Sequence, residues 1–422
     1  MFFSRPWFSR RWILQEVIQA RHAIFYCGEA MITSEVLVQA ASWFRHPDLK
    51  FLGLDDTILE SVMQMQSMMW GLNQHVKGRG VSDILDLLDI FQGNDCSDDK
   101  DRIFALLGLV DRGPLDGFNF PVDYHQSTAS IFVKFATQIL EQRDTIDILA
   151  FSGAMQRFSQ TKPSLNLPSW VPDWRFREKF KPLARSTEPL LGPQNGPSLF
   201  TRDSNILRLQ GLIFDKVAKA SLPDTAGDSE LESDDISKQW MEISKFFQGL
   251  TRYVNASSQT YLNCVRRTIM ADNSHSRTGQ SSIIDFVFAF MLGRGATSHS
   301  EMNASFSIQN EVTRHEDGSV SSTVNLNDVA NANKPLGFAE LVKITTAGRS
   351  FFVTEKGYIG IGPADTRLGD IVSVFRGARV PFLVRLRSAD LFMLIGDCYV
   401  HEMMDDKDSW MKTEAQQDFR IE

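Results

Sequence analysis

The C-terminal part of the chain contains a series of short apolar runs, each bounded by turn residues. The runs cover residues 350–354, 357–361, 370–375, 381–386 and 391–395. Such lengths, together with many β-branched and aromatic side chains, are typical of strands. Five strands of this kind favour a small barrel or a curled sheet. The sequence therefore predicts a β-rich module at residues 336–404.

The N-terminal residues carry the pattern with the most chemical content. Apolar residues recur at helical spacing at Ile13, Val17 and Ala20. Trp12 and Glu16 share an adjacent stripe, one turn apart. This spacing predicts a helix within residues 9–26, with Ser9 as its N-cap, and a strand-like run at residues 23–26 that leads into a turn at residues 27–28. Because three arginines precede Glu16 closely, its carboxylate is either part of a buried ion pair or a working acid.

Three later segments add to the expected secondary structure. Residues 96–109 predict a helix that Ser97 caps and that Gly108 ends in the left-handed conformation. A further helix is expected at residues 127–140. Residues 167–174 hold two prolines and two tryptophans, so this stretch is predicted to cross a core in extended form.

In order along the chain, these segments resemble the fungal heterokaryon-incompatibility (HET) domain. The central motif of that family is an Arg-Trp-x-x-Gln-Glu-Val helix followed by Cys-Gly, which residues 11–17 and 27–28 match. Residues 96–109 resemble its Ala-Leu-Leu-Gly-Leu signature, and residues 354–401 resemble a module often fused to HET domains. In the family the central motif comes well into the domain. Here the segment that contains this motif starts at residue 5, so the resemblance implies an HET domain that lacks its N-terminal half.

The resemblance also implies a fold class, α/β to α+β. HET domains are similar to Toll/interleukin receptor (TIR) domains, so residues 1–175 are expected to form a partial TIR-like domain with a helical extension. Residues 176–203 are rich in Pro, Gly, Ser and Arg and are interpreted as a linker. Residues 204–422 are expected to form an α+β region, with an acidic loop at 224–235 before the β-rich module.

The function that the resemblance implies is non-self recognition leading to programmed cell death. Several TIR domains cleave NAD+, and their catalytic helix resembles Ser-x-Trp-x-x-x-Glu. Ser9, Trp12 and Glu16 approximate this pattern, with one additional residue between Ser and Trp. Under this hypothesis Glu16 is the catalytic carboxylate that stabilises positive charge on the ribose. Trp12 and Ser9 are weaker substrate-binding candidates, and NAD+ is a substrate, so no cofactor is expected.

Two other interpretations of the same residues stay open. Glu16 pairs with Arg10 or Arg11 and only locks the helix into its domain. Alternatively, the chain is a non-enzymatic signalling module or an inactive paralogue that binds complete HET proteins. A catalytic helix needs an opposite wall to hold a nucleotide. If the chain truly begins at Met1, inactivity is therefore expected.

Composition narrows the partners and the compartment. The net charge is −8 with scattered Lys and Arg, which argues against a nucleic-acid partner. The four cysteines are far apart, which favours a reduced, cytoplasmic setting. A mitochondrial presequence shares the composition of the first residues, but the HET resemblance accounts for them. No apolar run reaches the roughly eighteen residues of a membrane span. The expected partners are other incompatibility or HET proteins, or further copies of the chain.

The sequence contains one cysteine that could be a nucleophile and one group of potential metal ligands, and neither is assigned a functional role. Cys27 lies near His22 in sequence, and a buried structural thiol is the favoured interpretation over a nucleophile. His401 with Glu402, Asp405 and Asp406 could be drawn as a metal cluster. An exposed acidic end after the last strand explains these residues as well, so no metal site is predicted.

Overall fold

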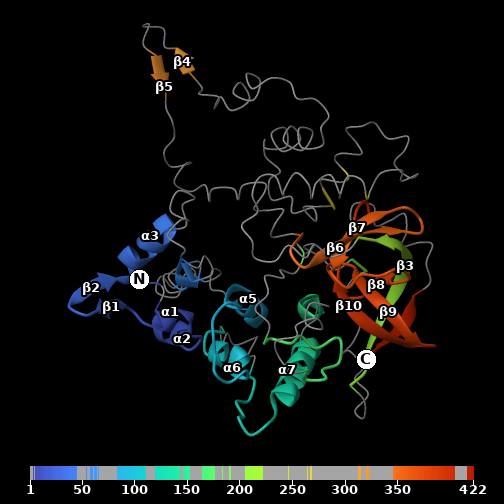
Figure 1. Cartoon of the computed structure of the whole chain (residues 1–422), viewed down its shortest axis with the longest axis horizontal. Coiled ribbons are helices and arrows are strands. Elements are labelled where there is room, and N and C mark those ends of the chain that lie inside the picture. The colour runs from blue at the N-terminus through green and yellow to red at the C-terminus, as the bar shows by residue number, and fades with distance from the viewer. Residues whose placement is uncertain are drawn as a thin grey trace. The chain divides into compact units, whose positions relative to one another are not determined.

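The structure is a computed structural model of the whole chain (Figure 1). It describes residues 3, 5–44, 54, 58–59, 61–63, 65, 83–110, 119–142, 146–152, 164–175, 183, 190–191, 205–221, 246, 264, 267–268, 312–314, 320–322, 346–403 and 416–422. The chain divides into two compact units. The first comprises residues 1–178, 194–208 and 420–422, and the second comprises residues 179–193 and 209–419.

The described elements of the first unit are mostly helical. They are α1 (Pro6–Ser9), α2 (Ile13–Ile18), β1 (Ile24–Cys27), β2 (Ala30–Thr33), α3 (Ser34–Phe44), α5 (Ile84–Ile90), α6 (Asp101–Leu107), α7 (Thr128–Gln142) and the 3-10 helix η2 (Asp147–Phe151). Helix α2 packs against α6, and α5 also packs against α6. The predicted helix at 127–140 is confirmed as α7, which buries its apolar stripe.

The helix predicted within residues 9–26 is confirmed only as α2, and the strand-like run at 23–26 is confirmed as β1, whereas the N-cap role of Ser9 is wrong. Ser9 ends α1, and its Oγ donates a hydrogen bond to the Pro6 carbonyl over 3.0 Å. The backbone N–H of Asp95 donates to the Ser9 carbonyl, and the Arg11 N–H donates to the Asp95 carbonyl over 2.7 Å. Because this long-range bridge takes up the backbone groups, the chain cannot continue as one helix and restarts at Ile13.

Helix α6 starts and ends differently from the sequence prediction. Asp98 Oδ1 accepts a hydrogen bond from the Lys100 N–H over 2.9 Å, a turn that delays the helix to Asp101. Gly108 has a φ of −72°, so the predicted left-handed stop is wrong. A Cβ added at Gly108 would lie 2.8 Å from Gln15 Nε2. A side chain at this position would therefore force the amide of Gln15 to shift.

The stretch at residues 167–174 is not helical, as predicted, but it is not extended throughout, because the Val171 N–H donates to the Pro168 carbonyl over 3.0 Å and closes a turn. Trp170 is fully buried, and its Nε1 donates to the Asn205 carbonyl over 2.8 Å. Its own carbonyl accepts from Ser152 Oγ over 2.8 Å, and the Ser169 N–H donates to the Glu422 carbonyl over 2.8 Å. The strap thus fixes distant segments of the first unit to one another.

An eight-stranded sheet contains all five of the predicted C-terminal strands. The strand order is β11-β7-β6-β3-β12-β10-β9-β8. The strands are β3 (Leu207–Ala220), β6 (Arg349–Thr354), β7 (Ile359–Pro363), β8 (Ile371–Phe375), β9 (Phe382–Ser388), β10 (Leu391–Asp397), β11 (Tyr399–Val400) and β12 (Gln417–Ile421). A separate hairpin joins β4 (Val312–Arg314) to β5 (Val320–Ser322). The sequence thus predicts the local strands correctly, whereas β12 is a finding of the structure.

Strand β3 is the long strand that bends the sheet back on itself. It pairs with β6 and β12, and it also pairs with β8 (Figure 1). The strands β3, β12, β10, β9 and β8 therefore form a closed circuit of hydrogen-bonded neighbours. A Cβ at Gly211 would lie 2.5 Å from the Val374 carbonyl oxygen, so the approach of β3 to β8 requires glycine there.

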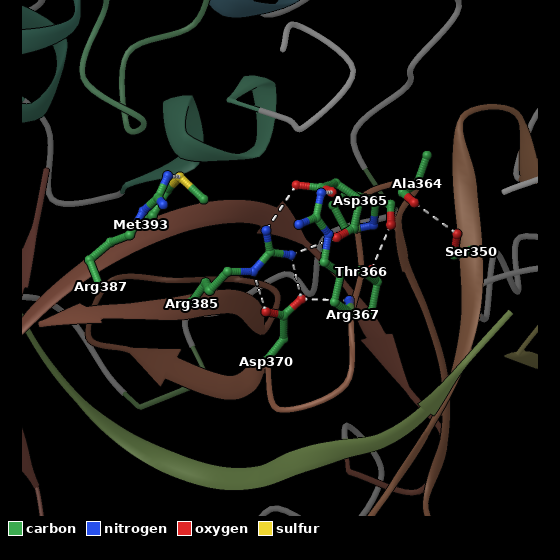
Figure 2. A network of polar contacts seen from close by, with 10 residues as sticks. Ser350, Ala364, Asp365, Thr366, Arg367, Asp370, Arg385, Arg387 and Met393 are labelled. Carbon is green, nitrogen blue, oxygen red and sulfur yellow. Dashed lines mark hydrogen bonds and ion pairs between the residues drawn. The ribbon is translucent and has the colours of Figure 1, made fainter. Parts of the chain in front are cut away.

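A charged network holds the loop between β7 and β8 to strand β9 (Figure 2). Arg385 on β9 donates from Nε to Asp370 Oδ1 over 2.8 Å and from Nη1 to Asp365 Oδ2 over 3.1 Å. Arg367 Nη2 lies 2.6 Å from Asp365 Oδ1. Because each carboxylate meets a guanidinium, the network is balanced in charge, and its role in the fold is to fix the loop.

Three residues of the expected linker are described, of which Leu183 and Leu190 are buried and Leu191 is half-buried. The Leu183 N–H donates to Asp397 Oδ2 over 2.7 Å, and the Leu190 N–H donates to the Ala378 carbonyl over 2.7 Å. At these two positions the segment belongs to the second unit. Among the described helices, none has the length and apolar character needed to cross a bilayer. The acidic loop at 224–235 lies outside the described residues.

Candidate functional site

Helix α2 carries Glu16 on its exposed side. Its opposite side is buried through Ile13, Leu14, Val17 and Ile18. Gln15 Nε2 donates to the Ala105 carbonyl over 3.0 Å, and Gln19 Nε2 donates to the Gly108 carbonyl over 2.8 Å. These contacts fix the helix against α6 and its C-terminal end. The carboxylate of Glu16 is thereby exposed on a firmly docked helix.

No side-chain hydrogen bond joins the three sequence-predicted site residues to one another within the described part of the chain. Trp12 stands at the N-cap position of α2 and is half-buried. Ser9 belongs to α1, where its hydroxyl is bonded to the Pro6 carbonyl. No hydrogen bond or ion pair of Glu16 occurs within the described ranges, so neither Arg10 nor Arg11 pairs with it there. The interpretation of Glu16 as one half of an arginine ion pair is therefore not what the structure shows.

The arginines of this region instead bind backbone carbonyls. Arg11 is buried, and its Nη1 donates to the Phe91 carbonyl over 2.6 Å. Arg102, also buried, donates from Nη1 to the Asn94 carbonyl over 2.5 Å. Burial first, and then the nearby charge of Arg102, lowers the pKa of Arg11 to about 9. Both guanidinium groups hold the turn after α5, a structural role that no local sequence pattern indicates.

A small apolar hollow lies beside the buried side of α2. Its volume, as room for the centre of a water molecule, is about 10 Å³. It is lined by Trp7, Phe8, Val17, Phe25, Ser34, Leu37, Val38, Val62 and Met65. This space accommodates about one water molecule, far less than a nucleotide needs. Glu16 is not among the lining residues, so the hollow does not supply a substrate pocket for its carboxylate.

The hairpin that follows α2 exposes large apolar side chains on one face. Tyr26 on β1 pairs directly with Met31 on β2. Ile24, two residues before Tyr26, points to the same face because side chains alternate along a strand. The exposed fractions of Ile24, Tyr26 and Met31 are 51%, 70% and 61%. We call these three side chains the hairpin face.

The other face of the hairpin is attached to the first unit. The ring of Phe25 meets the ring of Trp7 edge-on, with the centroids 5.6 Å apart. Phe25 also lines the apolar hollow. The hairpin is therefore anchored through one face while it presents the other to solvent. A two-stranded hairpin alone is marginally stable in water, so this anchoring is what makes the hairpin face a defined surface.

Comparison with known proteins finds one matching domain family and one curated relative. Residues 328–421 match the family described as the Het-6 beta-barrel domain. Over 95% of its length the chain is 24% identical to heterokaryon incompatibility protein 6, OR allele, of Neurospora crassa. The chain is similar to heterokaryon-incompatibility (HET) proteins. It spans 64% of the length of that curated relative. No solved structure matches the chain.

The family match covers the strands from β6 to β12. Helix α2 and the hairpin of the first unit lie outside that match. The site residues of the first unit therefore have to be judged on their own geometry. That geometry favours the hairpin face, which the sequence analysis did not single out. The signal was present in the alternation of Ile24 and Tyr26 about an inward-facing Phe25, but exposure cannot be read from alternation alone.

The four cysteines of the chain are all free thiols. Cys27 is half-buried at the end of β1, and Cys264 and Cys398 are buried. Burial raises the pKa of the Cys398 thiol well above its ordinary value. A buried thiol with a raised pKa is a poor nucleophile. Cys398 is therefore a packing residue of the sheet.

Proposed function

We propose that this HET-type protein acts in fungal non-self recognition by binding a partner protein through the hairpin face. The name of the Neurospora relative supports a role in heterokaryon incompatibility. The exposed hairpin face supports the proposal that the chain acts by binding a partner protein. Contiguous exposed apolar side chains on a folded surface are typical of interaction sites. Tyrosine and methionine are also enriched at the centres of protein interfaces.

The anchoring of the hairpin explains why this surface suits recognition. Since Phe25 packs against Trp7, the exposed side chains are held in fixed positions before any partner arrives. A partner therefore does not have to meet the cost of ordering the strands. Truncating a central aromatic residue at such an interface typically costs about 2 kcal/mol or more of binding free energy. Tyr26 is the expected anchor, with Met31 beside it.

The partner is proposed to be another incompatibility or HET protein. A second copy of the chain would be seen in the same experiments as a homo-oligomer. We also propose that this interaction takes place in the cytoplasm, because the widely spaced cysteines favour a reduced setting. We further propose that the first unit is a TIR-related partial domain and that the closed circuit of strands is a small barrel. The boundaries at residues 175 and 204 stay a prediction.

The experiment measures the survival of fused fungal cells. One strain expresses the chain, and its mating partner differs at the incompatibility loci. We expect fused cells to die with the wild type and to survive with the double variant Tyr26→Ser/Met31→Ser. Leu368→Ser is the matched control, because Leu368 is 74% exposed but lies in the second unit. Equal death with the double variant at equal protein level would reject the hairpin face.

A second candidate function is cleavage of NAD+ with Glu16 as the key carboxylate. The observation that favours it is the exposure of Glu16 on a docked helix, where no guanidinium neutralises it within the described residues. In this proposal Glu16 stabilises positive charge on the ribose, and Trp12 and Ser9 contact the substrate. The site would need a second wall opposite α2. NAD+ would be consumed as a substrate.

A further inference from the structure

Three potential metal ligands meet in the second unit, although they are far apart in sequence. They are Cys264, His401 and Glu402, and their ligand atoms all lie within 4.8 Å of one another. Cys264 and His401 are buried, and Glu402 is half-buried. A thiol, an imidazole and a carboxylate that converge out of solvent form an unusual polar group for a protein interior.

The sheet positions two of the three ligands. The His401 N–H donates to the Ile359 carbonyl over 2.9 Å, which continues the pairing of β11 with β7. A Cβ at Gly360 would lie 2.6 Å from the Tyr399 carbonyl oxygen, so β11 is held very close to β7. His401 therefore follows a strand that main-chain hydrogen bonds fix to β7.

Glu402 has a backbone conformation that is rare for its residue type. Its φ is +69°, in the left-handed region. Residues other than glycine rarely adopt this conformation. Such strain is found where a side chain has to be aimed at a particular place. Here it brings a carboxylate beside Cys264 directly after His401.

Cys264 lies in a helical turn, where Thr268 Oγ1 donates to its carbonyl over 2.9 Å. Burial first, and then the charge of Glu402, raises the pKa of this thiol to about 11.

We propose that Cys264, His401 and Glu402 bind a zinc ion. Sulfur, nitrogen and oxygen ligands together are those that Zn²⁺ prefers. Around a tetrahedral zinc, the ligand atoms lie roughly 3.3 to 3.8 Å apart, so small side-chain movements would close the present arrangement onto the ion. Three protein ligands leave a fourth position for water or for another group.

The surroundings of His401 suit this role. Tyr399 Oη lies 3.3 Å from His401 Nδ1. A zinc ion bound through Nε2 would leave the Nδ1 proton to donate to that hydroxyl. Such a hydrogen bond fixes the tautomer and the ring orientation of a ligating histidine. The cluster in the structure differs from the group of His401, Glu402, Asp405 and Asp406 that the sequence suggested. Cys264 is its third member, and both aspartates lie outside the described residues.

The test measures metal bound to the full chain after chelation and dialysis against Zn²⁺. We expect about one zinc ion per chain in the wild type, loss of that ion in Cys264→Ser, and at least about tenfold weaker binding in Glu402→Gln. Cys27→Ser and His125→Gln are the matched controls, since neither residue belongs to the cluster, and both should keep the ion. Circular dichroism in chelator shows whether each variant folds.

Cobalt gives a second readout that does not depend on any variant. Co²⁺ bound by a cysteine thiolate produces a charge-transfer absorption, and we expect this band in the wild type and in Cys27→Ser. Its absence from the wild type would overturn the site. So would a wild type that retains no zinc, or a folded Cys264→Ser that retains as much zinc as the wild type.

Discussion

The guanidinium of Arg349 and the carboxylate of Asp397 form an ion pair that is closed off from solvent. Arg349 Nη2 lies 3.0 Å from Asp397 Oδ1, and the exposed fractions of the two side chains are 1% and 0%. Arg349 begins β6 and Asp397 ends β10, so the pair joins two parts of the sheet. Asp397 Oδ2 also accepts from the Leu183 N–H. The pair thus fixes residue 183 to the second unit.

Removing one partner of this pair should strongly destabilise the second unit. Arg349→Met leaves the carboxylate of Asp397 buried without its counter-charge, which typically costs about 3 to 5 kcal/mol. Urea unfolding measures the loss. The matched control is Arg367→Met, which breaks an ion pair whose arginine is exposed and should cost less than about 1 kcal/mol. Equal unfolding midpoints for the two variants would contradict the role given to the buried pair.

Tyr124 should ionise above its ordinary range. Its hydroxyl donates to Asp101 Oδ1 over 2.5 Å. Burial, followed by this hydrogen bond and the charge of Asp101, raises the pKa of Tyr124 above its ordinary value of 10. The folded state therefore holds the proton more tightly than the unfolded state. The resulting stabilisation is fully present below pH 10 and is lost as the pH rises above it.

The measurement is the phenolate absorbance of the wild type minus that of Tyr124→Phe during an alkaline titration. Asp101→Asn should return the pKa of Tyr124 toward 10, because it removes the negative charge next to the hydroxyl. The stability advantage of the wild type over Tyr124→Phe should also shrink above pH 10. A titration of Tyr124 at its ordinary value would show that the contact with Asp101 is absent in solution.

The catalytic proposal for Glu16 has its own prediction. Because Glu16 is exposed, Glu16→Gln should change the stability by less than about 0.5 kcal/mol. If the second candidate function holds, the purified wild type consumes NAD+, and the variant loses most of that activity. Mass spectrometry of nicotinamide release measures both. Identical release from the two proteins would remove Glu16 from any catalytic role.

Elements with local signals were predictable from the sequence. Helix α7 starts where Ser127 Oγ accepts from the Ser130 N–H over 3.2 Å, a cap that the sequence displays. The short C-terminal strands carry their turn residues at both ends, so β6 to β10 follow from the pattern. The strap around Trp170 follows from its prolines, which exclude a helix.

Elements that depend on distant partners were not predictable. Ser9 looks like a helix start, but the backbone of Asp95 binds to it and ends α1 there. Gly108 looks like a left-handed helix stop, yet its φ is −72°, and the end of the Gln15 side chain lies close to it. Likewise, the sequence does not indicate that Cys264 lies beside His401, because the two residues are far apart along the chain and meet only in the folded sheet region. Local periodicity carries no information on such contacts.

The most direct test of the recognition proposal is a photo-crosslink from the hairpin face. A benzoylphenylalanine placed at Tyr26 is irradiated in fused incompatible cells, and the same residue placed at Leu368 is the control. We predict a crosslinked adduct to another incompatibility or HET protein from position 26 in incompatible fusions, and none from position 368. No adduct at position 26, or equal adducts at both positions, would contradict the claim that the hairpin face binds the partner.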